Sequence, residues 1–237
     1  MVTEPCDEEA MRIVGWIALV VLAVPVGNFP ANAKQPRGRP CVDRSGAPPR
    51  VVPRDEADQR PDFAEFRQRL RQAVARRDAD AVIAILHPQI KVGFDGSDGP
   101  DAFKERHLKN PEEDFWKEFG AVLSMGGRFG PNEFTAPYTF TDFPNDLDAF
   151  ECMVVTGRDV LLRAAPRSTA RIVARLDHHV VQVFFDDATN GAWRRVETAD
   201  RRVGYISSRY LRSPIDYRAS FRFENGRWWL VMYLAGD

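Results

Sequence analysis

The sequence predicts an α+β protein that carries an inserted all-β barrel. Helical patterns and two strand-like runs occupy residues 61–145, and short strands separated by turns occupy residues 151–213. A hairpin pattern follows over residues 216–235, beyond the end of the barrel pattern. We therefore expect helices and an antiparallel sheet in a discontinuous domain, residues 61–150 plus 214–237, with the barrel inserted into it.

A secretory signal peptide is predicted at the N-terminus. Ile13–Val26 is the only long apolar run, a basic residue precedes it, and the small-x-small site Ala31-Asn32-Ala33 follows. The run has 14 residues, whereas a membrane span needs roughly 20. We expect cleavage to remove residues 1–33 and to release a periplasmic or secreted protein without a membrane part; an uncleaved membrane anchor is the alternative. Acidic residues before Met11 are unusual in a signal, so a start at Met1 or at Met11 stays open.

Two cysteines, Cys41 and Cys152, remain after signal cleavage. In an oxidising compartment an even pair can form a disulfide. Such a bridge would close a loop of more than 100 residues, which stabilises the fold by roughly 4–5 kcal/mol in the chain-entropy model. The alternative is two unrelated thiols, with Cys152 buried in a strand.

The mature chain is expected to begin with a leader and two helices. Residues 34–60 are rich in Pro, Arg, Asp and Gly without apolar periodicity, which predicts an extended, partly disordered segment. Order is expected from Pro61, and Asp78 can cap a second short helix that ends before Pro88. The first helix carries apolar residues at helical spacing: Phe63, Phe66, Leu70, Ala73 and Val74.

The next elements alternate between strands and helices. Ile90–Phe94 is predicted to be a strand, Asp95–Pro100 a turn and Ala102–Leu108 a short helix. Asn110 is a capping residue before a Pro and three acids, which predicts the start of a longer helix. Gly126-Gly127 ends that helix, and its apolar stripe consists of Phe115, Phe119 and Val122.

Three further strands complete the predicted outer sheet. Phe134–Phe140 is predicted to be a strand, and a loop follows it. Asn225-Gly226 is a strong two-residue hairpin signal, and Trp228–Ala235 after it is apolar, as in a strand buried on both faces. The strand before the turn alternates, with Tyr217, Ala219, Phe221 and Phe223 on one face. Because a lone hairpin is marginal in water, we expect it to pair with Ile90–Phe94 and Phe134–Phe140.

Segments between Glu151 and Leu211 resemble, in order, the strands of bacterial SH3-like (SH3b) domains. They cover about 60 of the 237 residues. The segments are Val155-Thr156-Gly157, Val160–Pro166, Val173–Leu176, Val180–Phe184, Gly191–Val196 and Arg202–Leu211. Departures at Leu161, Ala164-Ala165 and Tyr205 are compatible with the barrel, but they do not allow the family's ligand specificity to be transferred.

This resemblance implies a binding module rather than an enzyme. It implies contact with peptidoglycan, a peptide or an envelope protein, with Trp193, Tyr205 and Tyr210 as binding residues, because flat amphipathic rings suit stacking on sugars or peptides. The alternative is that at least Trp193 and Tyr205 fill the barrel core. No cofactor is implied, the formal net charge of −1 argues against nucleic acid, and the oligomeric state is not indicated.

Two rival hypotheses concern the α+β half. Helices before a sheet that ends in a Trp-rich hairpin are loosely similar to the NTF2-like fold. In a pocket of such a fold, His87 and Asp95 would act as a base and its orienting acid, which would make the protein an envelope enzyme or a small-ligand binder. The third hypothesis is a structural interaction protein whose barrel packs on its own host domain. No G-x-S-x-G, H-E-x-x-H or P-loop string supports an enzyme.

Two clusters of polar residues in the sequence match known metal-binding patterns only in part. Asp177-His178-His179 is expected at a solvated strand edge, where adjacent side chains point to opposite faces and do not readily share a metal. Asp95, Asp98 and Asp101 lie in a Gly-rich loop without the EF-hand spacing, so turn and capping roles are favoured over a weak Ca²⁺ site. We therefore predict no metal site.

Overall fold

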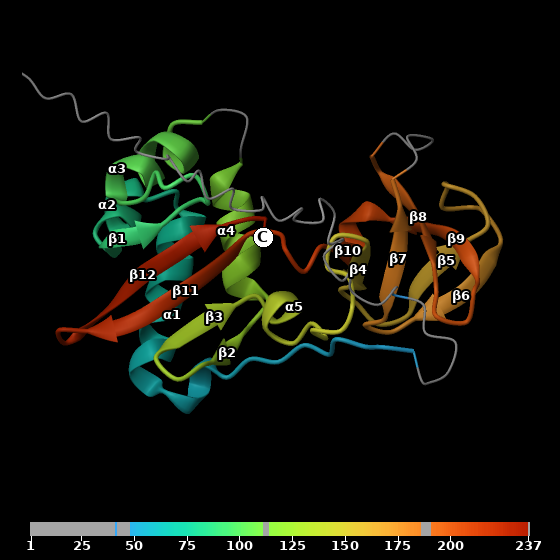
Figure 1. The fold of residues 1–237 in the computed structure, drawn as a ribbon, viewed down its shortest axis with the longest axis horizontal. Helices are drawn as coiled ribbons and strands as arrows, with labels where there is room; N and C mark the ends of the chain where they lie inside the picture. The colour runs from blue at the N-terminus through green and yellow to red at the C-terminus, as the bar shows by residue number, and fades with distance from the viewer. Residues whose placement is uncertain (1–40, 42–47, 111–113, 186–190, 237) are drawn as a thin grey trace, which may run out of the picture. The chain divides into compact units, whose positions relative to one another are not determined.

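The computed structural model describes residue 41 and residues 48–110, 114–185 and 191–236. Figure 1 shows a mixed α+β fold with two sheets, both mostly antiparallel. The predicted signal peptide lies outside the described residues. Within the described part of the chain, no helix has the length and apolar character needed to cross a bilayer.

The first sheet has five strands and joins the C-terminal hairpin to strands from the N-terminal half, as predicted (Figure 1). Its order is β1 (Leu86–Lys91), β12 (Arg227–Leu234), β11 (Arg218–Glu224), β3 (Glu133–Ala136) and β2 (Arg128–Phe129). One expectation is wrong: β1 pairs with β12 in parallel, not antiparallel. A long connection separates these two strands in sequence, so no tight turn fixes their relative direction.

The hairpin turn forms at Asn225 and Gly226, which have φ angles of 52° and 79°. The predicted alternation along β11 holds only in part, since Arg218 is buried and Phe223 is 43% exposed. The pairing register shifts between Ser220 and Phe221. The extra residue is Val231 on β12, so the irregularity lies in the partner strand and does not reverse the faces of β11.

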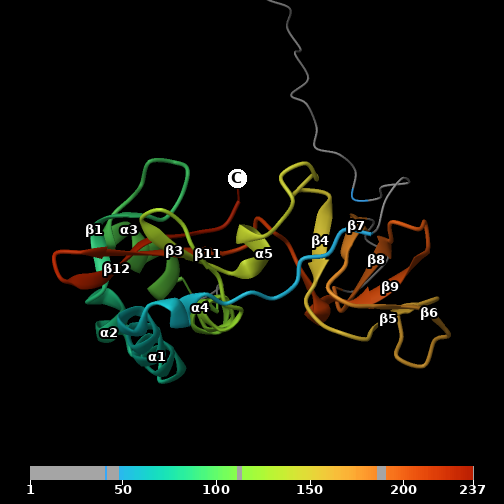
Figure 2. The same ribbon diagram turned by 90° about the horizontal axis from the view of Figure 1, so that it is seen from below.

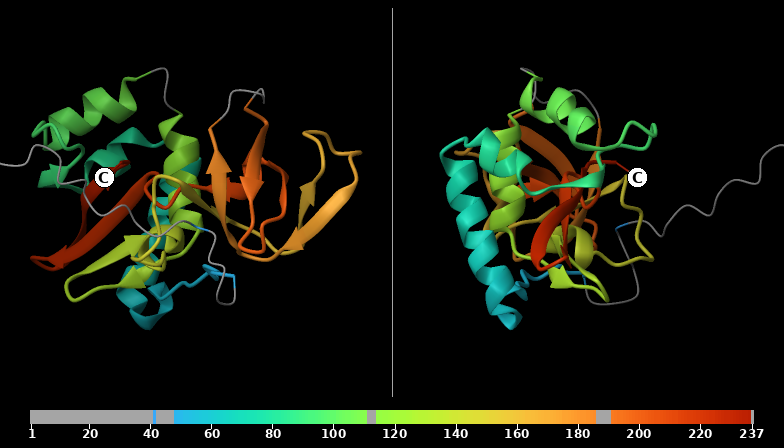
Figure 3. Two further views of the ribbon diagram at one scale, coloured as in Figure 1. Left: turned by 45° about the vertical axis from the view of Figure 1, so that its right-hand side comes forward. Right: turned by 90° about the vertical axis from the view of Figure 1, so that its left-hand side faces the viewer.

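Helices α1 (Pro61–Ala75) and α4 (Phe115–Ser124) contribute to one core with the first sheet (Figure 3). Fully buried members of this core are Phe63, Phe119, Val122, Phe134, Phe221 and Leu230. In the sequence between α1 and α4, the helical elements are α2 (Ala79–Ile83), α3 (Pro100–Phe103) and a π-helical turn, Lys104–Leu108. Asp78 caps α2 as predicted, because its carboxylate accepts the Ala81 N–H at 3.0 Å.

Several predicted boundaries are wrong. Helix α2 ends at Ile83 rather than just before Pro88, and β1 covers Leu86–Lys91 rather than Ile90–Phe94. Helix α4 is capped by Asp114, whose carboxylate accepts the Lys117 N–H at 3.2 Å, and not by Asn110. The predicted helix start at Pro111–Glu113 lies outside the described residues. The predicted strand over Phe134–Phe140 ends at Ala136, and the short helix α5 (Tyr138–Thr141) follows. Pro137 separates them, since proline has no N–H to donate to a sheet.

Of the predicted leader, residues 34–60, the structure describes residue 41 and residues 48–60, and residues 48–56 run without helix or strand apart from a β-bridge at Arg50. Backbone hydrogen bonds hold this part in place: the Val51 N–H donates to the His178 carbonyl at 2.9 Å, and the Glu56 N–H donates to the Gly127 carbonyl at 2.9 Å. Val51 is buried, and a 3₁₀ turn forms at Ala57–Gln59. Polar composition did not indicate these contacts because they are made by the main chain.

The second sheet has seven antiparallel strands (Figure 2). Their order is β10 (Leu211–Arg212), β4 (Cys152–Val155), β7 (Val180–Phe184), β8 (Trp193–Glu197), β9 (Val203–Ser207), β5 (Val160–Arg163) and β6 (Ile172–Leu176). The predicted closure into a barrel is not observed: among the described residues, the outer strands β10 and β6 pair with only one neighbour each. Strand β10 has two residues and the β5–β9 contact one residue pair, so too little ladder is present for closure.

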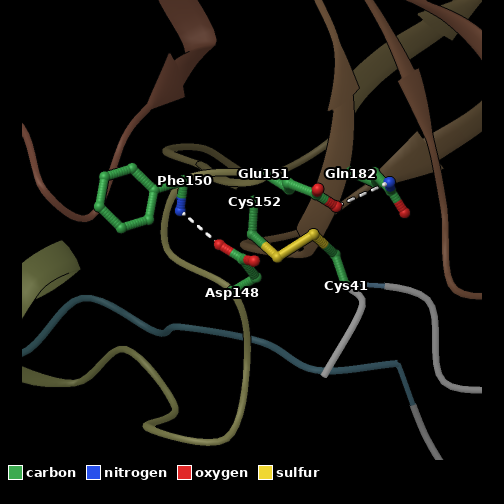
Figure 4. The surroundings of a disulfide bond; sticks show 6 residues. All are labelled: Cys41, Asp148, Phe150, Glu151, Cys152 and Gln182. Carbon is green, nitrogen blue, oxygen red and sulfur yellow. Dashed lines mark hydrogen bonds between the residues drawn. A yellow bond between two sulfur atoms is a disulfide. The ribbon is translucent and has the colours of Figure 1, made fainter. Parts of the chain in front are cut away.

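Cys41 and Cys152 form a disulfide, the pairing considered from the sequence (Figure 4). Both cysteines are fully buried, among Val51, Tyr138 and Val154. The bond ties residue 41 to strand β4 of the second sheet.

A partly buried ion pair joins β10 of the second sheet to helix α4, which packs on the first sheet. Arg212 on β10 lies 2.6 Å from the Glu118 carboxylate on α4, and it also donates to the Tyr217 carbonyl at 3.0 Å. The Arg212 side chain is only 10% exposed. The two sheets are therefore linked by a specific polar contact as well as by the covalent chain.

Candidate functional site

The three predicted binding aromatics are half-buried; none is a fully buried member of the core of the second sheet, and Tyr210 packs against that core. That core consists of Val155, Val160, Leu162, Leu176, Val181, Val183, Val196 and Ile206. Because side chains alternate along a strand, Val196 pointing inward places Trp193 on the outer face of β8. In the same way Ile206 pointing inward places Tyr205 on the outer face of β9. The alternative that Trp193 and Tyr205 fill the core is therefore wrong.

A cavity of about 410 Å³ opens beside these strands. Trp193 and Tyr210 line it, whereas Tyr205 does not. The other lining residues are Arg158, Asp159, Val160, Leu161, Arg163, Ser168, Ser207 and Arg209. Strands β5, β8 and β9 thus each contribute to one concave site, as does the 3₁₀ turn Ser208–Tyr210.

The strand register and a nearby turn position the two rings. Trp193 lies directly opposite Ser207 in the β8–β9 pair. The Tyr210 carbonyl accepts the Thr156 N–H at 2.9 Å. A Cβ atom at Gly157 would lie 3.1 Å from the Val160 side chain and 4.0 Å from the Tyr210 ring. Glycine at this position therefore lets the turn before β5 lie close to the tyrosine.

The charge of the cavity is positive. Arg158, Arg163 and Arg209 line it together with one acid, Asp159. The Asp159 carboxylate lies 2.6 Å from the guanidinium of Arg175, so its charge is already compensated. Within the described part of the chain, no carboxylate lies within ion-pair distance of those three arginines. The cavity therefore offers guanidinium donors to an anionic ligand.

Two of these arginines have additional contacts that fix their position. Arg163 donates to the Ala170 carbonyl at 2.8 Å, which leaves other N–H groups of its guanidinium for a ligand. The Arg209 guanidinium lies 4.6 Å from the centre of the Tyr210 ring, a cation–π contact. The sequence analysis missed both arginines. Alternation places Arg163 on the face opposite to Leu162, but its position in the cavity depends on strands that are distant in the sequence.

The hypothetical base and acid of the α+β half take different partners. His87 Nδ1 accepts the Gln89 N–H at 3.0 Å, and its Nε2 lies 3.5 Å from Glu224. Asp95 is exposed and bonds Arg106 at 2.8 Å. The Ser97 N–H and then Arg106 hold the pKa of Asp95 below its usual range. The geometry does not assemble the base and orienting acid that the enzyme hypothesis requires.

The three acids of the Gly-rich loop are each neutralised by a separate cation. Asp98 lies 2.9 Å from Lys91, and Asp101 lies 2.6 Å from Lys104. These lysine contacts lower the pKa of both carboxyls. Within the described residues, no cluster of His, Cys, Asp and Glu suitable for a metal ion is formed.

The Asp177-His178-His179 string is not a solvated strand edge. His178 is only 8% exposed, and its φ of 53° shows a turn before β7. The leader covers it, since Arg50 and His179 form a β-bridge and Val180 N–H donates to Pro49 at 2.9 Å. His179 Nδ1 accepts the Asp177 N–H at 2.9 Å. These histidines hold the leader and turn together rather than sharing a metal.

Comparison with known proteins adds no assignment to this geometry. No family model matches the chain, and no curated protein matches it.

Proposed function

We propose that this protein is an exported binding protein of the bacterial cell envelope. In this proposal the second sheet is an SH3-like module, and its ligand is a peptide or the peptide part of peptidoglycan. The observation that carries the proposal is the cavity in which Trp193 and Tyr210 line one site with three arginines. The ordered series of SH3-like segments in the sequence supports it independently.

The chemistry of the cavity suits a peptide ligand. Indole and phenol rings provide flat contact area with few rotatable bonds, so little conformational entropy is lost on binding. Guanidinium groups bind carboxylates through paired, directional hydrogen bonds. Stem peptides of peptidoglycan and the ends of envelope peptides both carry carboxylates, so both can meet these donors.

Export is supported by two independent features of the chain. The sequence begins with a signal-like apolar run and a small-x-small site. The Cys41–Cys152 bond belongs to a class of cross-link that persists mainly outside the cytosol. Together they favour a periplasmic or secreted location.

The structural alternative has one supporting observation. The Arg212–Glu118 ion pair docks β10 on α4, as a module that merely packs on its own host would do. Neither residue lines the cavity, however, so this ion pair does not occupy the proposed binding site.

Retention on purified peptidoglycan sacculi tests the proposal. We expect the full mature chain to be retained and the Trp193→Ala variant to lose about tenfold or more of its affinity, as for a central aromatic contact. Trp229→Ala is the matched control, because it removes a half-buried indole from the other sheet. Wild-type protein that stays in the supernatant, or equal retention of both variants, would refute the proposal for peptidoglycan.

A further inference from the structure

One acid, Asp159, lines the cationic cavity, and an arginine outside the cavity compensates its charge. Arg175 on β6 does not line the cavity, yet its Nη1 atom donates to both carboxylate oxygens of Asp159, at 2.7 Å and 2.6 Å. Both side chains are more than half exposed, so water screens the pair and we expect it to add little to the stability of the fold. The pair matters more for the cavity, because it decides how much negative charge Asp159 presents there.

The strand register brings Arg175 to the edge of the cavity. Arg175 lies directly opposite Leu161 in the β5–β6 pair, and Leu161 lines the cavity. Leu162 and Leu176 are buried in the core, so alternation places Leu161 and Arg175 together on the outer face. Asp159 precedes Leu161 by two residues, and a long side chain such as that of arginine can reach such a diagonal neighbour.

The turn before β5 fixes the backbone of Asp159. Its φ angle is 55°, in the left-handed region, and its N–H donates to the Asp177 carboxylate at 2.6 Å. Its side chain therefore starts from a fixed position between two sets of cations. Arg175 is on one side, and the arginines of the cavity are on the other.

An uncompensated carboxylate at this position would oppose the proposed ligand in two ways. It would repel a carboxylate of the ligand, and it would compete with that carboxylate for the guanidinium groups of the cavity. Two unit charges about 4 Å apart in water interact strongly enough to change an affinity by about fivefold. The bond to Arg175 removes most of this opposition before a ligand arrives.

We infer that Arg175 is a positioning residue of the cavity: by holding Asp159, it leaves Arg158, Arg163 and Arg209 available to an anionic ligand. This inference rests on the proposed function, because it concerns what the same cavity accepts. It makes the selectivity of the cavity depend on β6, an outer strand that contributes no lining residue.

A purely structural role of the ion pair predicts a different result. If the pair only fastens β6 to β5, losing Arg175 and losing the charge of Asp159 are equivalent, because either change breaks the same bond. If Arg175 acts on the cavity, the two changes have opposite effects on an anion. Removing the charge of Asp159 then compensates for the loss of Arg175.

Ionic quenching of Trp193 fluorescence measures the charge of the cavity in the full mature chain without any ligand. Iodide and caesium are quenchers of opposite charge, and acrylamide is a neutral reference. The emission of Trp193 is obtained by subtracting the signal of each variant that also carries Trp193→Phe. In Arg175→Ala we expect iodide quenching relative to acrylamide to fall about twofold and caesium quenching to rise, because Asp159 is no longer compensated.

Asp159→Asn provides the rescue. Asn tolerates the left-handed backbone but carries no charge, so Arg175→Ala/Asp159→Asn should regain wild-type quenching although the ion pair is still missing. Arg175→Lys should behave like the wild type, because it keeps a cation beside Asp159. Arg171→Ala is the matched control, since it removes the same charge from an exposed position just before β6 that does not line the cavity.

Three quenching results would overturn the inference. The first is wild-type quenching in Arg175→Ala, and the second is a double variant that remains as weakly quenched by iodide as Arg175→Ala. The third is an equal effect of Arg171→Ala, which would mean that the total charge of this region matters rather than the contact with Asp159.

Sacculus retention applies the same comparison to a ligand and separates the two proposals. We expect Arg175→Ala to lose about fivefold in affinity and the double variant to regain it, while Asp159→Asn alone binds at least as well as the wild type. If wild type and Arg175→Ala are retained equally, the inference fails and the proposed function stands. A loss of retention in Asp159→Asn alone would also overturn the inference, because Asp159 would then contact the ligand itself. If the wild type is not retained but the quenching pattern is as expected, peptidoglycan is excluded and the role of Arg175 stands.

Discussion

His178 lies in a turn with a left-handed backbone, and its neighbours explain why. Its N–H donates to the Gly157 carbonyl at 3.0 Å, and its own carbonyl accepts from Val51. Burial, followed by the positive charge of Arg158, holds the pKa of His178 below its ordinary value of 6.5. Burial, followed by Arg50, lowers the pKa of His179 in the same way. Both side chains are therefore neutral in the folded protein at pH values where the unfolded chain begins to charge them.

This arrangement predicts how stability depends on pH. Below about pH 6.5 the unfolded chain binds protons at these histidines that the native state binds only at lower pH. The contribution of the neutral histidines to the free energy of unfolding is therefore fully present above that pH, and it decreases as the pH drops towards 5. Urea unfolding at pH 7.5, 6 and 5 measures the slope, and His178→Asn should reduce it while tolerating the left-handed backbone. A wild-type stability that stays constant over this range would contradict the prediction.

At the residue scale, the sequence predicted the two rings of the cavity but not its charge. Trp193 and Tyr210 are predicted from the sequence because flat amphipathic rings suit stacking on sugars or peptides. Arg158, Arg163 and Arg209 were missed because the chain has many arginines and nothing local distinguishes these three. Arg209 adjoins Tyr210 in the sequence, whereas the pairing of β5, β9 and β8 brings Arg163 to the same cavity as Trp193.

At the element scale, capping residues determine where helix α4 begins and ends. Asp114 caps the first turn, and Gly126 with a φ of 72° follows the last turn. A carboxylate before the first turn satisfies an N–H group that has no partner within the helix. Pro111 in the sequence favoured an earlier start, but the side-chain bond to Lys117 fixes the cap at Asp114.

The capping role gives a prediction with a built-in control. Asp114→Ala should lower the free energy of unfolding by about 1 kcal/mol, whereas Asp114→Asn should change it little, because Asn caps helices as well as Asp does. Chemical unfolding of both variants at neutral pH measures the difference. Equal losses in the two variants would show that the charge, rather than the cap, is what α4 requires.

Elements with strong local signals were predicted well, and those set by distant partners were not. Helical spacing identified α1, and Asn225-Gly226 identified the β11–β12 turn. The parallel direction of β1 and the order of the leader depend on residues far away in the sequence. Local periodicity contains no information about such partners, so these features became clear only from the pairing.

At the scale of the whole molecule, the disulfide is a long-range covalent constraint. It joins residues 111 positions apart and fixes the leader to β4. A bond that closes so long a loop restricts the unfolded chain more than the folded one.

Removing this bond should destabilise the protein without changing its fold. The double variant Cys41→Ser/Cys152→Ser is expected to lose about 4–5 kcal/mol of unfolding free energy in the chain-entropy model. Urea unfolding with and without dithiothreitol provides the comparison, and the reductant should affect only the wild type. A wild-type midpoint that is unchanged by full reduction would contradict the prediction.

The pairing of β4 with β10 has a consequence for how this architecture arises. Val155 lies opposite Leu211, so the chain leaves the second sheet beside the point where it came in. A segment with adjacent ends can be gained or lost during evolution through a short joint, while the five-stranded sheet keeps its own strand order. In this chain the Cys41–Cys152 bond and the Arg212–Glu118 ion pair add two further attachments beside these adjacent ends, so the second sheet is held by more than its two chain connections.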